Sequence, residues 1–114
     1  MRKLALLAVL LLPAIAFAGE AFLAEIEDVP LAPGLTEAPG GLVFDSPTGR
    51  IVEASASGAV SAEQVRSFYN ETLAQLGWRS TGDLQFRRDN ETLKIDIDPR
   101  RKPLVVHFNL TPRA

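Results

Sequence analysis

Hydrophobic and polar residues follow three different patterns along this chain. An unbroken apolar run from Leu4 to Leu12 opens the sequence. Residues 61–77 repeat apolar positions every three or four residues, which is typical of an amphipathic helix. Residues 42–57 and 78–112 instead alternate apolar and polar positions over short runs, which is typical of strands with one buried face. We therefore predict an α+β domain.

The helix is the best-defined element of the pattern. Ser61 and Gln64 form a capping box, in which the serine oxygen accepts the Gln64 N–H and the glutamine reaches back. Gly77 is typical of a left-handed C′ residue, and Trp78 can fold back onto Leu73 as in a Schellman motif. We expect the apolar stripe between these caps to lie in the core: Val65, Phe68, Tyr69, Leu73 and Leu76.

Two strands are predicted before the helix, at residues 42–44 and 50–57. The segment between them, Ser46-Pro47-Thr48-Gly49, has the signature of a type I turn. Because Ile51 and Val52 are both apolar, the register of this hairpin is open between two loop lengths. The small side chains of residues 54–58 favour the close approach of another element, and we expect the helix there.

The chain after the helix continues with strand-like runs at residues 78–81, 84–88, 93–98 and 104–110. Asp89-Asn90 is predicted as a two-residue turn, which sets Phe86 beside Leu93 and Leu84 beside Ile95. The pattern therefore predicts an antiparallel sheet of about five strands, two before the helix and three or four after it (order ββαβββ), with the helix packed on one face. The uncovered face is expected to carry Arg87, Lys94, Asp96, Asp98, Val105, His107 and Asn109.

The first 18 residues have the pattern of a secretory signal peptide. A cationic head at Arg2 and Lys3 precedes the apolar run, and small residues stand at Ala16 and Ala18. The apolar run is shorter than the roughly 20 residues that span a bilayer, so an uncleaved anchor is the less favoured reading. We expect cleavage after Ala18 and a periplasmic protein that does not span the membrane.

Residues 19–41 are predicted to form an extended, Pro/Gly-rich N-terminal arm. The density of proline and glycine between Asp28 and Gly41 disfavours both helix and sheet. Leu31 and Leu35 give the arm something to bury. One interpretation is that the arm packs these side chains loosely on its own domain or remains mobile. The other is that the arm becomes ordered when it docks on a partner. The expected division is thus 1–18 signal peptide, 19–41 arm and 42–114 α+β domain.

Composition narrows the possible classes of function. The chain has 114 residues and no cysteine, so neither a disulfide framework nor a cysteine-linked lipid anchor is available. The formal net charge of −2 becomes −4 once Arg2 and Lys3 leave with the signal peptide. An acidic domain lacks the concentrated basic face that nucleic acid binding requires, and we exclude that class.

Candidate chemistry is sparse. A single histidine and the absence of cysteine exclude a thiol nucleophile and a multi-histidine metal site. Asp96 and Asp98 alternate along a strand, which puts two carboxylates on one face, and His107 is expected on the same face beside Lys94. A small envelope hydrolase using these two aspartates and the histidine is therefore one alternative. We favour a solvated sheet face, with no catalytic residue, metal or cofactor.

Arg100, Arg101 and Lys102 form the one concentrated positive feature, at a predicted hairpin tip between two prolines. Such a tip can contact anionic lipid headgroups, lipopolysaccharide or an acidic partner. Charges beside strands also serve simply to discourage edge-to-edge pairing. We therefore count these three residues, with Asp96, Asp98 and His107, as candidate partner contacts.

Three stretches of the chain resemble a family of small exported, periplasmic proteins of Gram-negative bacteria. They are residues 44–54, residues 65–69 and the helix end Leu73-Ala74-Gln75-Leu76-Gly77-Trp78. The family pattern is a sheet hairpin, a helix reading F-Y-x-x-x-L-x-x-L-G-W and closing strands, and the resemblance covers roughly residues 29 to 112. It implies the fold but no reaction, and it carries over no functional residues.

The sequence as a whole favours a non-enzymatic envelope domain. Such a domain would bind a protein or an envelope polymer through its open sheet face, a sheet edge or the N-terminal arm. The alternatives are the hydrolase and the binding of a lipid or small ligand, for which a domain filled by one helix leaves little cavity. The identity of the partner and the oligomeric state stay open.

Overall fold

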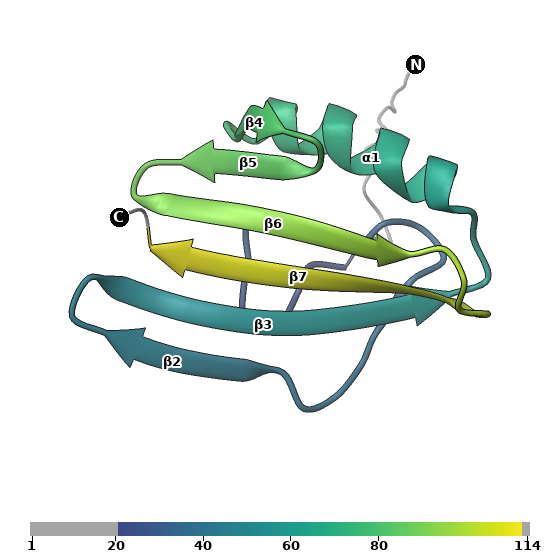
Figure 1. Ribbon diagram of the computed structural model, residues 1–114, viewed down its shortest axis with the longest axis horizontal. Helices are drawn as coiled ribbons and strands as arrows, with labels where there is room; N and C mark the ends of the chain where they lie inside the picture. The colour runs from purple at the N-terminus through teal and green to yellow at the C-terminus, as the bar shows by residue number, and fades with distance from the viewer. Residues whose placement is uncertain (1–20, 113–114) are drawn as a thin grey trace, which may run out of the picture.

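The computed structural model of the chain describes residues 21–112 (Figure 1). The expected signal peptide and its cleavage site lie outside these residues. The elements are β1 Thr36–Glu37, β2 Leu42–Ser46, β3 Gly49–Gly58, α1 Ala62–Gln75, β4 Arg79–Gly82, β5 Gln85–Arg88, β6 Glu91–Asp98 and β7 Leu104–Pro112. All seven strands belong to one antiparallel sheet in the order β1-β3-β7-β6-β5-β4, and β2 pairs with β3.

Over residues 21–112 the α+β class with a single helix is confirmed, but the expected five strands in the order ββαβββ are corrected to seven in the order βββαββββ. β1 was missed because it is only two residues long and lies among prolines and glycines. Four strands follow the helix, and they correspond to the four strand-like runs of the sequence, so the order ββαβββ counted one strand too few there.

The hairpin register that the sequence left open is fixed by a two-residue turn. Ser46 pairs with Gly49, and Val43 pairs with Val52. The Ser46 hydroxyl donates to the Gly49 carbonyl at 2.5 Å and accepts the Thr48 N–H at 3.3 Å, which stabilises the turn. In this register Val52 points into the core.

Helix α1 begins and ends at the expected residues. The Gln64 N–H donates to Ser61 Oγ at 3.1 Å, and the Ser61 N–H donates to Gln64 Oε1 at 3.0 Å, so the capping box is confirmed. At the other end Gly77 adopts a φ of +93°, and the Trp78 N–H donates to the Leu73 carbonyl at 2.9 Å. This is the Schellman motif.

The apolar stripe of the helix is narrower than expected. Val65, Tyr69 and Leu73 are buried and Phe68 is partly buried, but Leu76 is 39% exposed. Leu76 is the C-cap residue, where the chain leaves the helical path. The expectation that Leu76 joins the core is therefore wrong.

The register of the C-terminal strands agrees with the alternation of their residues. Phe86 pairs with Leu93, and the Ile95 N–H donates to the Leu84 carbonyl at 2.9 Å. The inner face of β7 buries Leu104, Val106, Phe108 and Leu110. Alternation along each strand thus assigns the inner and outer faces of the sheet.

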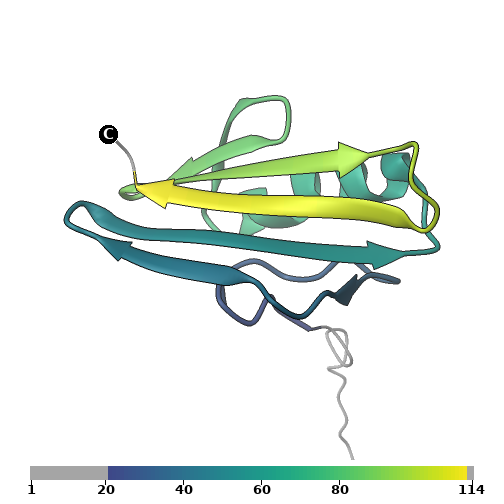
Figure 2. The same ribbon diagram turned by 60° about the horizontal axis from the view of Figure 1, so that its bottom comes forward.

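The N-terminal segment, residues 21–35, differs from the expected extended arm. It lies on the same side of the sheet as α1 and completes the layer that covers the core (Figure 1 and Figure 2). Its buried side chains are Leu23, Ile26, Val29, Leu31, Ala32 and Leu35. Prolines and glycines exclude this segment from regular structure, but they do not prevent its aliphatic side chains from packing.

Close approach to the small residues of β3 is made by this segment and not, as expected, by the helix. A Cβ atom added to Gly58 would lie 1.9 Å from the Gly34 carbonyl oxygen. Gly34 itself has a φ of +90°, and a Cβ there would lie 2.5 Å from Val60 Cγ1. Two glycines therefore permit the backbone contact that seats the segment on the sheet.

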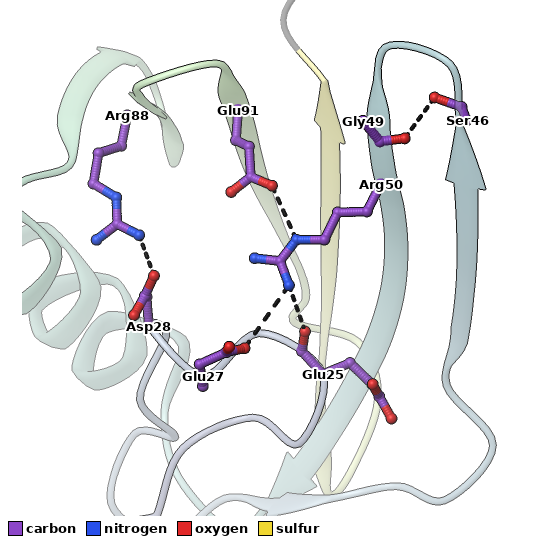
Figure 3. Close-up of polar contacts among 8 residues, drawn as sticks. All are labelled: Glu25, Glu27, Asp28, Ser46, Gly49, Arg50, Arg88 and Glu91. Atoms are coloured by element: carbon purple, nitrogen blue, oxygen red, sulfur yellow. Dashed lines mark hydrogen bonds and ion pairs between the residues drawn. The ribbon is translucent and has the colours of Figure 1, made fainter.

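Two arginines fasten the N-terminal segment to the sheet (Figure 3). Arg50 donates from Nε to Glu91 Oε2 at 2.9 Å and from Nη1 to the Glu25 carbonyl at 3.2 Å. The hydrogen bond to Glu91 is the main cause that raises the pKa of Arg50. Arg88 pairs with Asp28 and also donates to the Leu76 carbonyl at 3.1 Å.

Among residues 21–112, no helix has the length and apolar character needed to cross a membrane.

Candidate functional site

The outer face of the sheet brings two of the predicted site residues together. In the register of β6 and β7, Asp96 lies directly opposite His107, and Ser55 of β3 lies opposite His107 on its other side. The expected His107–Lys94 pair is wrong, because Lys94 lies opposite Asn109. Asp96 and His107 are both exposed.

Asp98 does not join this pair. It lies opposite Val105, and its carboxylate accepts the Arg100 N–H at 3.1 Å and lies 3.5 Å from Arg100 Nε. A hollow of about 170 Å³ touches His107, with Ser55 and residues 39–42 among its other walls, but neither aspartate lines it. The described residues contain no group of three His, Cys, Asp or Glu side chains placed to hold a metal ion.

The basic tip lies in the turn between β6 and β7. Arg100, Arg101 and Lys102 are exposed. Arg101 and Lys102 form one wall of a hollow of about 730 Å³, whose opposite wall is residues 58–62 and Gln64 at the start of α1. Cationic side chains beside an apolar hollow suit an amphiphilic anion, so contact between the tip and an anionic partner stays a prediction.

A different surface, on β2, was not singled out from the sequence. Leu42, Val43 and Phe44 are 49%, 46% and 54% exposed, and they are consecutive. Alternation along the strand puts Leu42 and Phe44 on the outer face and Val43 on the inner face. We call these three residues the β2 apolar patch. The only sequence signal for this exposed surface is a run of apolar residues without a charge, and such a run is equally typical of a buried strand.

The backbone of β2 presents free hydrogen-bonding groups beside the patch. Hydrogen-bonded and non-hydrogen-bonded pairs alternate along an antiparallel ladder. The Ser46–Gly49 pair closes the turn with hydrogen bonds, so Phe44 and Leu42 also direct their N–H and C=O groups at β3. The corresponding groups of Val43 and Asp45 therefore point away from the sheet.

Within residues 21–112, no strand covers that side of β2. The only strand with which it pairs, among the described residues, is β3 (Figure 1). β1 pairs with the same strand only at Ser57 and Ala56, beyond the end of β2. The sheet thus has an open edge over the whole length of β2.

The opposite edge of the sheet is built differently. β4 is four residues long, begins with Arg79 and has an irregular register with β5 between Ser80 and Gly82. Short length, charge and a bulge are the usual features that prevent an edge strand from pairing with another chain. β2 is five residues long, pairs with β3 without a bulge and carries its single charge at Asp45.

The chain matches no family model, no curated protein and no solved structure.

Proposed function

We propose that this protein is a non-enzymatic, exported domain of the cell envelope that binds an extended polypeptide segment along the free edge of β2. The observation that carries the proposal is the β2 apolar patch, an exposed run of three uncharged residues on an edge strand with a regular register. Exposed strands of this kind accept an additional strand, because the unpaired backbone groups provide a template.

The edge supplies both affinity and selectivity. The free N–H and C=O groups of Val43 and Asp45 provide the main-chain hydrogen bonds that hold an added strand. Side chains on alternate faces select the partner, with Leu42 and Phe44 on one face and Val43 on the other. The patch therefore favours a partner segment with apolar residues at successive positions.

The rest of the surface supports binding over catalysis. Asp96 and His107 lie on an exposed sheet face, and Asp98 is engaged by Arg100. A hydrolytic site needs an acid, a base and a substrate hollow to converge. Neither Asp96 nor Asp98 lines the hollow beside His107.

Replacement of Val43 by Pro tests the proposal. Its N–H faces away from β3, so proline removes a free donor without breaking the β2–β3 ladder, as proline does on natural edge strands. Immobilised wild-type protein should retain a protein from an envelope extract that the Val43→Pro variant does not retain.

His107→Ala is the matched control, because it alters the outer face away from β2. It should retain the same protein as the wild type. Equal retention by all three forms, or loss with His107→Ala alone, would assign binding to another surface. Circular dichroism confirms that both variants are folded.

A further inference from the structure

We infer that the strand added to β2 is β2 of a second copy, in an antiparallel two-fold pair centred on Val43. This inference rests on the proposed function, and it identifies the partner segment. Like most soluble oligomers, such a pair has closed two-fold symmetry, in which the same patch meets itself.

The direction of the free backbone groups selects the possible centres. In an antiparallel pair, a residue on the two-fold axis lies opposite its own copy. When the axis passes through Val43, the outward N–H and C=O groups of Val43 bond to those of the second copy. Asp45 then lies opposite Gly41 of the second copy, where its N–H and C=O also find partners.

The side chains favour the same register. With the axis at Val43, Leu42 lies opposite Phe44 of the second copy, and the symmetry repeats this pair. Every member of the β2 apolar patch then meets another member. Cross-strand pairs of aromatic and aliphatic residues stabilise an antiparallel sheet.

The other registers are worse for reasons of charge and polarity. With the axis at Asp45, two carboxylates face one another directly, and like charges in that position are destabilising. With the axis at Phe44, each Val43 lies opposite Asp45. The Val43-centred pair is the one in which every member of the β2 apolar patch meets another member while the carboxylates stay four residue steps apart.

The length of the edge sets the strength of the association. Pro39 and Pro47 bracket the strand, and neither can donate a main-chain hydrogen bond. A contact of two such short strands buries less than the roughly 1,200 Å² of a stable interface. The dimer is therefore weak and its population depends on protein concentration.

Cysteine cross-linking tests the register directly, because the natural chain contains no cysteine. Opposed Cα atoms in the inferred pair are about 5.5 Å apart, within the range of a disulfide. The Val43→Cys protein should form a covalent dimer under mild oxidation at high protein concentration.

Asp45→Cys is the matched control on the same strand and the same face. In the inferred register the two cysteines are separated by four residue steps, roughly 13 Å, and should not cross-link. Equal cross-linking of both variants, or preferential cross-linking of Asp45→Cys, would overturn the register.

Sedimentation separates this inference from the function on which it rests. Wild-type protein should change from monomer to dimer between micromolar and millimolar concentration, and Val43→Pro should stay monomeric. A wild type that is monomeric throughout overturns the second copy as partner. If the wild type is monomeric but captures a different protein through Val43, the proposed function still stands. If it captures no such protein, both the proposed function and the second-copy inference are overturned.

Discussion

Tyr69 joins helix α1 to the N-terminal segment through its hydroxyl group. The hydroxyl donates to the Pro30 carbonyl at 2.7 Å and accepts the Ala32 N–H at 3.1 Å. The ring packs edge-to-face against Phe108, with centroids 5.6 Å apart. Helical spacing predicted that Tyr69 lies in the core, but its hydrogen-bond partners lie more than 30 residues away in a segment without periodicity.

Substitution Tyr69→Phe should lower the free energy of unfolding by about 1–3 kcal/mol, because two buried backbone groups lose their partner. Urea unfolding followed by circular dichroism measures this loss. Ser67→Ala changes an exposed residue of the same helix and should have little effect. A Tyr69→Phe protein as stable as the wild type would mean that water replaces the hydroxyl.

Stability should also depend on Tyr69 at alkaline pH. Burial raises the pKa of Tyr69 in the folded protein, whereas the phenol of an unfolded chain has a pKa of about 10. The folded state therefore binds the phenol proton more tightly than the unfolded state does. The stability that this contributes is fully present below a pH of about 10 and is lost as the pH rises further.

The measurement is the difference in unfolding free energy between wild type and Tyr69→Phe at pH values below and above about 10. The difference should shrink as the pH rises, because only the wild type has this phenol to titrate. A difference that is constant with pH would show that the unfolded and folded states titrate alike.

At the scale of elements, local sequence signals predicted both caps of α1. The place of the N-terminal segment depends instead on packing between residues far apart in the chain. The capping box and the Schellman motif involve residues close in sequence, so their partners are visible in the pattern. The N-terminal segment was read as an arm because its prolines and glycines hide the periodicity of its buried aliphatic residues. Its place beside α1 depends on Gly34 and Gly58, which are far apart in the chain.

Ser61→Ala should lower the free energy of unfolding by about 0.5–2 kcal/mol, because the Gln64 N–H loses its acceptor at the start of α1. Ser67→Ala is the matched control for the same chemical change, without a cap to remove. Thermal unfolding of the two variants tests the contribution of the cap. Equal midpoints would show that the cap contributes nothing measurable.

Leu23→Ala should lower the free energy of unfolding by about 2–5 kcal/mol, because Leu23 is buried and truncation leaves a cavity. Leu76→Ala is the control with the same chemistry at an exposed position, and we expect a much smaller loss. Urea unfolding of both variants compares them. A Leu23→Ala protein as stable as Leu76→Ala would restore the reading of a loose arm.

At the scale of the whole molecule, the two edges of one sheet are treated differently. β4 carries the charge and irregular register that prevent edge pairing, whereas β2 exposes the apolar patch and free backbone groups. The sequence predicted the hairpin but not this contrast, because exposure of Leu42, Val43 and Phe44 depends on which strands lie at the edge. Strand order is a property of the complete sheet.

The outer face shows the same dependence on the whole sheet. Alternation assigned Asp96, Asp98 and His107 to one face, as observed in the register. The residue opposite His107 was predicted to be Lys94 and is Asp96. This prediction failed because the length of the turn between β6 and β7 cannot be derived from alternation alone.

The central claim is that the free edge of β2 accepts a strand, and amide hydrogen exchange resolved by residue tests it most directly. The Val43 and Asp45 amides should exchange quickly in dilute protein and become protected at high concentration. The Leu42 and Phe44 amides, bonded to β3, should be protected in both samples. If the copies associate while the Val43 and Asp45 amides still exchange as fast as in the dilute sample, the account is contradicted.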